Sequence, residues 1–178
     1  MLLRPTTRDE ADAVAAVHRA AFGSEIEADL ARDLMLDAGF EPAYSFAAEE
    51  DDALVGSVVF SRAAFVPDGG GPAVPVLLLA PLAVVPEAQH DGVGTALVEA
   101  ALALADALGE AAAFVFGDPA YYGRFGFVAA MPKGYRGPHP LEPEWGWQVL
   151  EFAEGALGGR AGYLRVAPPL DAPEMWIA

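Results

Sequence analysis

An apolar run of 12 residues, Val74 to Val85, constrains the fold more than any other feature of this chain. Apolar side chains on both sides of an extended segment predict a central strand that helices cover on both faces. Pro81 lies inside the run and has no N–H to donate, so pairing with one neighbouring strand is expected to fail through a bulge or a splay. With Pro75 and Pro81 inside it, the run is also shorter than the roughly 20 residues of a membrane span, so no membrane partner is expected.

The residues before this run predict two helices and a hairpin. Thr7 to Glu10 has the spacing of a capping box, which predicts a first helix from Thr7 to Phe22. Ser24 begins a second capping pattern, and this helix is expected to end near Gly39. Two strands follow, at 44–49 and 54–64, with an acidic turn between them.

The residues after the run continue the alternation of helix and strand. A long helix is predicted from Val93 to Gly109, where glycine ends it. The later expectations are a strand at 112–116, a short helix at 119–125, a strand from 127, a loop at 131–145, and strands at 148–152 and 162–166. This order predicts an α/β fold. A length of 178 residues with 54% apolar side chains predicts one domain over residues 1–178.

Charge and residue types exclude several function classes. The 26 acidic and 10 basic residues give a net charge of −16, which repels phosphate backbones, so nucleic acid is not an expected partner. The same charge favours solubility, or attracts a cationic substrate. There is no cysteine, and the three histidines lack metal-ligand spacing, so neither a disulfide nor a metal site is expected. The first residues reach Arg4 and Pro5 too early for a signal peptide, so a cytoplasmic location is expected.

A glycine-containing turn before the long helix is the first candidate for chemistry. It reads Gln89-His90-Asp91-Gly92-Val93-Gly94-Thr95. Two glycines let the backbone approach a ligand, and the N–H groups at a helix start attract phosphate. The pattern alone is weak, because an ordinary tight turn has the same residues. P-loop and Rossmann signatures do not fit, since the required lysine and third glycine are missing.

Two sequence motifs that occur in the expected order indicate a family more specifically than the glycine turn alone. The stretch from Leu82 to Gly94 resembles the acetyl-CoA-binding segment of the GNAT superfamily of N-acetyltransferases. The stretch from Gly117 to Phe127 resembles the strand-helix-strand segment of that family, with a tyrosine four residues before Gly-Phe, and is especially similar to its YhbS-like branch. The resemblance implies a twisted mixed sheet of six to seven strands, flanked by helices, whose central strand is splayed at a bulge.

The resemblance also implies acetyl-CoA as the cofactor and a set of residues that contact it. The opened strand would pair with the pantetheine arm, and the glycine turn would hold the pyrophosphate. The residues implied are Leu82, Ala83, Val84, Gln89, His90, Asp91, Gly92, Val93, Gly94, Thr95, Asp118, Tyr121 and Arg124. Asp91 departs from the family, which often has a basic residue there, and it is equally well suited to cap the helix. Arg124 is either a nucleotide contact or a solvated helix residue.

By the same resemblance, the reaction is direct transfer of an acetyl group to a primary amine through a tetrahedral intermediate. The family would make Tyr122 the acid that protonates the departing thiolate, with Tyr121 as the fallback. Glu27 is the first choice of base, but Glu25, Glu49 and Glu50 stay open, and each also suits a surface or cap role. The backbone N–H of Ala83 is a candidate to stabilise the oxyanion. His18 is interpreted as structural.

Some alternatives remain open from the sequence. The aromatic residues Phe65, Tyr135, Trp145 and Trp147 either line an acceptor pocket or fill a core. A non-catalytic acyl-CoA-binding module, an acyltransferase for longer acyl chains, and an unrelated nucleotide-dependent enzyme are the rival functions. The expected partner is a small-molecule or peptide amine. A homodimer is a hypothesis by analogy with the fold alone.

Overall fold

The computed structural model describes residues 1–178 and groups them into two compact units. Unit 1 contains Met1–Ser61 and Leu79–Ala107, and unit 2 contains Arg62–Leu78 and Leu108–Ala178. The two long strands, β3 (Ala53–Pro67) and β4 (Val74–Val84), contribute residues to both units. The expectation of a single domain over residues 1–178 stays a prediction. None of the helices combines the length and hydrophobicity that a membrane crossing needs.

The strands of unit 1 form an antiparallel ladder. Strand β1 (Leu2–Pro5) pairs with β2 (Phe46–Glu50), and β2 pairs with the first part of β3. Asp51 and Asp52 in the connecting turn have φ values of 49° and 63°, the twist that a two-residue hairpin requires. The hairpin prediction is therefore confirmed. Strand β1 was not predicted, because four residues that include an arginine and a proline carry no alternating pattern.

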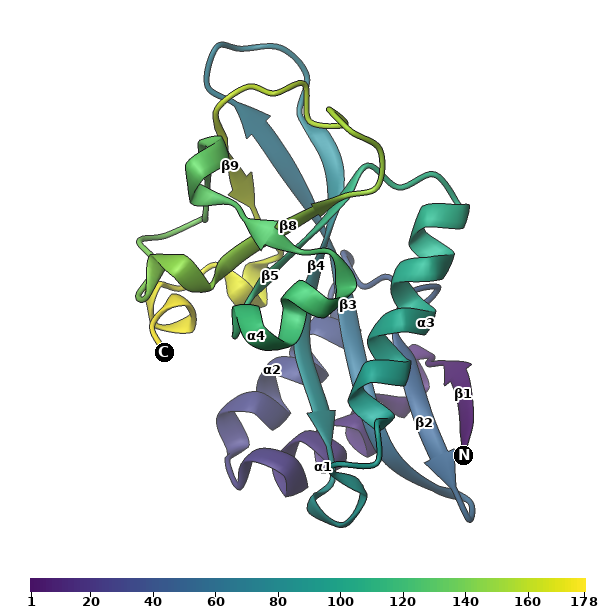
Figure 1. The fold of residues 1–178 in the computed structure, drawn as a ribbon. Helices are drawn as coiled ribbons and strands as arrows, with labels where there is room; N and C mark the ends of the chain where they lie inside the picture. The colour runs from purple at the N-terminus through teal and green to yellow at the C-terminus, as the bar shows by residue number, and fades with distance from the viewer. The chain divides into compact units, whose positions relative to one another are not determined.

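Three helices cover the strands of unit 1, and Figure 1 shows α1 and α2 behind them and α3 in front. Helix α1 (Ala11–Phe22) follows a 3₁₀ turn at Arg8–Glu10, where the Thr7 N–H donates to the Glu10 carboxylate over 2.9 Å. Helix α2 (Glu25–Leu36) begins where the Ser24 hydroxyl accepts a hydrogen bond from the Ile26 N–H over 3.1 Å. Helix α3 spans Val93–Ala107. All three helices were predicted to within a few residues.

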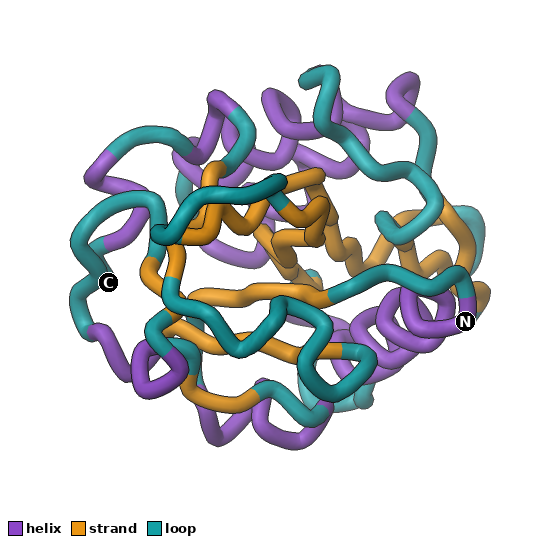
Figure 2. Tube along the Cα trace, turned by 90° about the horizontal axis from the view of Figure 1, so that it is seen from above, coloured by secondary structure: helices purple, strands orange, loops and turns teal.

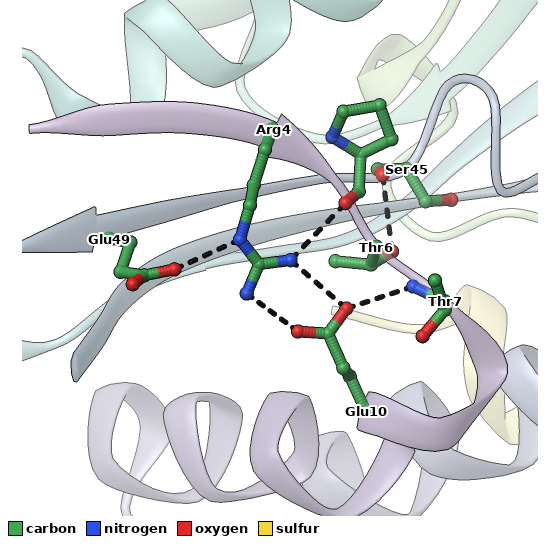
Figure 3. Close-up of polar contacts among 7 residues, drawn as sticks. Arg4, Thr6, Thr7, Glu10, Ser45 and Glu49 are labelled. Atoms are coloured by element: carbon green, nitrogen blue, oxygen red, sulfur yellow. Dashed lines mark hydrogen bonds and ion pairs between the residues drawn. The ribbon is translucent and has the colours of Figure 1, made fainter. Parts of the chain in front are cut away.

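Arg4 joins three elements of unit 1, as Figure 3 shows. Its guanidinium donates to Glu49 of β2 over 2.9 Å and to Glu10 of the 3₁₀ turn over 2.7 Å. Beside it, the Thr6 hydroxyl donates to the Ser45 carbonyl over 3.1 Å. Strand β1 is thereby tied both to its neighbouring strand and to the start of α1.

Unit 2 is built around β5 (Ala112–Phe116), which pairs antiparallel with β8 (Trp147–Glu151). Strand β6 (Val128–Ala129) pairs with β8 as well, while β9 (Gly162–Arg165) pairs with the second part of β3 and, in parallel, with β7 (Tyr135–Arg136). Helix α4 (Pro119–Tyr122) continues into a 3₁₀ turn, and Figure 2 shows loops and short helical turns toward the C-terminus. The remaining 3₁₀ turns are Pro86–Ala88 in unit 1 and Met131–Lys133, Glu144–Gly146, Pro168–Leu170 and Pro173–Trp176 in unit 2.

The mixed α/β sheet is confirmed, with β4 between β3 and β5 in the strand order. The chain forms nine strands where six to seven were expected, and the two that were not predicted are β1 and the two-residue strand β7. The segment 131–145, predicted as a loop, contains β7 and two 3₁₀ turns. These elements are only two or three residues long, so the prolines and glycines around them made the whole segment look like a loop.

Gly162 gives a stability prediction for unit 2. A Cβ at this position would lie within 3 Å of the Val66 carbonyl and the Phe65 ring, both of which are fixed in the sheet. We expect Gly162→Ala to lower the free energy of unfolding by about 1–3 kcal/mol in urea titrations. Gly69→Ala, where a Cβ would contact nothing, is the control and should stay within about 0.5 kcal/mol of wild type. Equal losses in the two variants would contradict this account.

Candidate functional site

The second half of β4 belongs to unit 1 and is less enclosed than the first half. Residues 76–79 are buried, whereas Ala80, Pro81, Leu82 and Val84 are only partly buried and Ala83 alone stays at 3% exposure. Pro81 has no N–H to donate to a neighbouring strand. This part of β4 therefore combines a missing backbone donor with partial access to solvent.

The turn after β4 folds back on the strand and leads into α3. The Gln89 side-chain amide donates to the Val84 carbonyl over 2.9 Å. His90 and Gly92 adopt positive φ values of 72° and 79°, and a Cβ on Gly92 would meet no atom within 4 Å. The Gln89 hydrogen bond therefore fixes the turn to β4, while the space beside Gly92 is free of protein atoms.

The start of α3 presents backbone donors without helical partners. The first intrahelical bond runs from the Ala96 N–H to the Gly92 carbonyl over 3.0 Å, which leaves the N–H groups of Val93, Gly94 and Thr95 unused by the helix. Gly92 thus occupies the N-cap position, and the suggestion that Asp91 caps the helix is wrong. An anion fits such a helix start through hydrogen bonds and the helix dipole.

Gly56 of β3 fixes the position of this helix start. A Cβ at residue 56 would lie 2.9 Å from a Val93 methyl group and 3.0 Å from a Leu97 methyl group. Because only glycine fits there, α3 approaches β3 closely, beside the carbonyl of Ala83. Gly56 was not among the predicted site residues, although a glycine inside a strand is a signal of close backbone approach.

Tyr122 is the central residue of the second candidate segment, in unit 2. Its ring contacts Tyr121 at 4.9 Å and Phe127 at 5.9 Å between centroids, and it rests on Gly117, where a Cβ would lie 2.5 Å from the ring. Burial raises the pKa of the Tyr122 phenol above its ordinary value of 10. Tyr122 is therefore a neutral phenol at pH 7 whose ring is held in place.

Three neighbours complete this segment. The Asp118 carboxylate accepts a hydrogen bond from the Ala120 N–H over 2.9 Å and caps α4. The Arg124 guanidinium lies 4.4 Å from the centroid of the Tyr121 ring, and its Nε donates to the Tyr121 carbonyl over 3.1 Å. Arg124 is therefore not simply solvated: a cation–π contact holds its exposed positive charge beside Tyr121.

The candidate bases differ in their surroundings. Glu25 is ion-paired with Arg19, and Glu49 with Arg4, so both carboxylates are already bound to cations. Glu27 of α2 is partly buried, and its Oε2 is enclosed without any hydrogen-bond partner. His18 of α1 is fully buried, and both of its ring nitrogens also lack partners.

The aromatic residues considered for an acceptor pocket belong mainly to the core of unit 2. Phe65, Tyr135 and Trp147 are buried, and Phe114 lies between them, 5.1 Å from Trp147 and 6.3 Å from Tyr135 by ring centroids. The Trp147 indole donates to the Tyr135 carbonyl over 3.1 Å. The core interpretation is therefore correct for these three, while Trp145 is 64% exposed.

Comparison with known proteins identifies the family. A family model described as an acetyltransferase (GNAT) domain matches residues 3–130. This chain belongs to the GNAT acetyltransferase family. Among curated proteins, it is 36% identical to the uncharacterized N-acetyltransferase YjhQ of Escherichia coli K12 over 169 residues, which are 92% of this chain and 91% of YjhQ. It is 34% identical to the uncharacterized N-acetyltransferase YhbS of the same strain over 162 residues, which are 91% of this chain and 93% of YhbS.

Solved structures confirm the GNAT fold. The structure of E. coli YhbS in complex with CoA matches with a TM-score of 0.83 and 29% identity, covering 96% of this chain and 92% of that one. A GNAT acetyltransferase from Brucella melitensis in complex with acetyl-CoA matches with a TM-score of 0.72 and 24% identity, covering 96% and 97%. The family that was predicted from the two motifs is therefore confirmed.

The predicted site residues of this GNAT protein fall into two sets. Unit 1 holds Glu27 and the candidates from Leu82 to Thr95, and unit 2 holds Asp118, Tyr121, Tyr122 and Arg124. In unit 1, Gln89 is hydrogen-bonded to Val84, and in unit 2, Tyr121 contacts both Tyr122 and Arg124. Sequence reasoning missed Gly117, whose lack of a side chain makes room for the Tyr122 ring, and treated His18 as ordinary core.

The buried His18 leads to a prediction about acid stability. Burial lowers the pKa of His18 from 6.5 to about 4, so between these values the unfolded chain binds more protons than the folded one. Stability is therefore lost as the pH falls from 6.5 to 4, by up to about 3 kcal/mol at 1.36 kcal/mol per pKa unit. We expect His18→Gln to flatten this loss in urea titrations at pH 7.5, 5.5 and 4.5. The exposed His90→Gln is the control, and a wild-type slope in His18→Gln would refute the assignment.

Proposed function

We propose that this GNAT protein transfers an acetyl group from acetyl-CoA to a primary amine. The observation that carries the proposal is the run from the proline-containing half of β4 through an open glycine turn to the unpaired N–H groups of α3. The bound CoA of YhbS, a relative with the same fold, supports the choice of cofactor. The cytoplasmic location, the absence of a nucleic-acid partner, and the homodimer stay predictions.

Different residues of unit 1 would bind different parts of CoA. The N–H groups of Val93, Gly94 and Thr95 are donors for the pyrophosphate, while Gly92 lets it approach the backbone. The backbone of Leu82 and Val84 would pair with the pantetheine amides like an added strand. Gln89 is already bonded to β4 and would brace the turn. His90 and Asp91 are exposed, so the Asp91 carboxylate is free to turn toward solvent, away from phosphate.

Toward the nucleotide end, unit 2 would contribute Asp118, Tyr121 and Arg124. Arg124 carries the positive charge, and its contact with the Tyr121 ring limits the freedom of its side chain. Asp118 acts through its cap on α4, which fixes the backbone that carries both tyrosines. The main role of these three residues would therefore be to position the Arg124 charge and the Tyr122 phenol, and direct binding of the nucleotide would be secondary.

The proposed reaction is attack of the amine nitrogen on the thioester carbonyl, followed by loss of CoA as its thiol. A nitrogen–carbon bond forms through a tetrahedral intermediate, and the carbon–sulfur bond then breaks. Tyr122 would donate its proton to the leaving sulfur, since a phenol with a pKa of 10 or above is protonated at pH 7. Glu27 would accept the proton of the amine, and the Ala83 N–H would stabilise the negative carbonyl oxygen.

The rival functions differ from this proposal in measurable ways. A non-catalytic acyl-CoA-binding module would bind the cofactor without turnover, and an acyltransferase for longer chains would prefer a longer acyl-CoA. A nucleotide-dependent enzyme would bind NAD or ATP instead. The family membership favours acyl transfer over the last of these.

Cofactor binding is the first prediction, tested by calorimetric titration with acetyl-CoA, NAD and ATP. We expect saturable binding of acetyl-CoA alone, and at least a tenfold loss of affinity in Gly92→Trp, because an indole there covers the N–H groups of α3. Gly69→Trp, in the exposed loop after β3, is the matched control and should bind like wild type. Absence of acetyl-CoA binding in the wild type would overturn the proposed function.

Turnover is the second prediction, tested by following CoA release with a thiol reagent. Tyr122→Phe keeps the ring packing against Gly117 but removes the proton donor, so we expect kcat to fall by about 10²-fold or more. The dissociation constant for acetyl-CoA should change by less than about twofold. Tyr121→Phe serves as the control. If Tyr122→Phe keeps full kcat, Tyr122 is not the acid.

A further inference from the structure

The corner between α1 and α2 collects enclosed polar atoms that have no partner. Five buried side-chain atoms in the whole chain lack a hydrogen bond: both ring nitrogens of His18, Oε2 of Glu27, and the hydroxyls of Ser57 and Ser61. Gly56 faces α3, so Ser57 and Ser61 on the alternate positions of β3 face the opposite side, where Figure 1 shows α1 and α2. Of these residues, His18 and Glu27 lie close enough to interact electrostatically, so their unpaired atoms belong to one place in unit 1.

Elsewhere in the chain, buried polar side chains are satisfied. The Ser45 hydroxyl donates to the Glu41 carbonyl over 2.9 Å and accepts from the Phe60 N–H over 2.9 Å. The Gln148 amide donates to the Gly117 carbonyl over 3.1 Å. Since folded proteins normally satisfy buried polar groups, the enclosed atoms of His18 and Glu27 are candidates for contact with a bound group.

The charge at this corner defines what kind of partner fits. Glu27 forms no ion pair, although its neighbours on α2 do: Glu25 pairs with Arg19, and Asp29 pairs with Arg32. Beside it, burial keeps His18 neutral, so its ring offers one nitrogen lone pair and one N–H. A carboxylate oxygen and an imidazole nitrogen are two acceptors, and a group with several N–H donors and a positive charge satisfies both.

The rim of the same corner is apolar. The Phe22 ring stacks on the His18 ring at 6.2 Å between centroids and 15° between planes, yet Phe22 is 49% exposed. Ile26, next to Glu27 in sequence, is 67% exposed. Polar atoms below and apolar side chains at the surface suit a ligand with a charged end and an apolar body.

We propose that His18 and Glu27 form the seat for the ammonium group of the acceptor, and that the acceptor is a primary amine on an apolar body that contacts Phe22 and Ile26. This inference rests on the proposed function and narrows its substrate class. A polyamine fits less well, because its second ammonium group would meet the apolar rim. His18 is a binding residue here, and its neutral state lets it accept a hydrogen bond from the ammonium group without adding a repelling charge.

Equilibrium binding tests this seat without any need for turnover. Calorimetric titrations would compare 2-phenylethylamine with 1,5-diaminopentane on the full chain, with and without CoA. We expect 2-phenylethylamine to bind at least tenfold more tightly than the diamine. Glu27→Gln should weaken that binding at least tenfold, and Glu25→Gln, whose carboxylate faces solvent in an ion pair with Arg19, should change it less than twofold. Phe22→Ser should weaken 2-phenylethylamine more than the diamine.

The histidine ring provides an independent signal. The chain has only three histidines, so ¹⁵N-histidine NMR resolves His18 once His18→Gln has assigned it. Adding 2-phenylethylamine should shift the His18 resonances in wild type and in Glu25→Gln, but not in Glu27→Gln. Urea titrations of each variant check that it is folded.

The outcomes separate this inference from the proposed function. If acetyl-CoA binds and turnover occurs, but Glu27→Gln binds 2-phenylethylamine like wild type or the diamine binds more tightly, the seat is wrong and the acetyltransferase proposal stands. If acetyl-CoA does not bind, the proposed function fails, whatever the amine does. An unchanged His18 signal under saturating amine would also overturn the seat.

Discussion

Close packing of α3 on β3 at Gly56 is the contact on which the proposed cofactor site depends. Because residue 56 has no side chain, Val93 and Leu97 reach the sheet, and the first turn of α3 lies beside the Ala83 carbonyl of β4. The turn between β4 and α3 has only eight residues, 85–92, to join two ends fixed in this way. Positive φ values at His90 and Gly92 let the chain make that connection. The unpaired N–H groups at the start of α3 are therefore held in place by packing, without help from a ligand.

The few cations of this chain are used mainly for structure. Arg4, Arg32, Arg62 and Arg136 each form ion pairs with acidic side chains, and Arg62 holds Glu110 through two bonds of 2.7 and 2.8 Å. With 26 acidic residues against 10 basic ones, most carboxylates have no such partner and lie in water. Glu27 differs because one of its oxygens is enclosed. The acidic surface thus favours approach of a cationic acceptor, while Glu27 offers a specific place for its charge.

The sequence predicts most of this fold because its long elements carry clear patterns. Three kinds of signal located their elements to within a few residues: the capping residues at Thr7 and Ser24, the apolar run of β4, and the glycine after α3. Strands β1 and β7 depend on pairing with distant partners, which no local pattern encodes. The same limit applies to the site. Sequence motifs indicated Gly92 and Tyr122. The roles of Gly56 and Gly117, in contrast, come from the side chains that pack against them. The lack of hydrogen-bond partners at His18 likewise depends on residues that are distant in the sequence.

Desolvation favours the neutral form of two residues that the proposals use. Burial raises the pKa of Tyr122 and lowers that of His18, and in both cases the neutral form is favoured at pH 7. A neutral phenol retains the proton that a leaving thiolate needs. A neutral imidazole retains the lone pair that an ammonium group needs. Among the acidic residues in the first turns of α2, Glu25 and Asp29 are paired with arginines and Glu27 is not, so the preference for a cationic acceptor rests on this partly buried carboxylate.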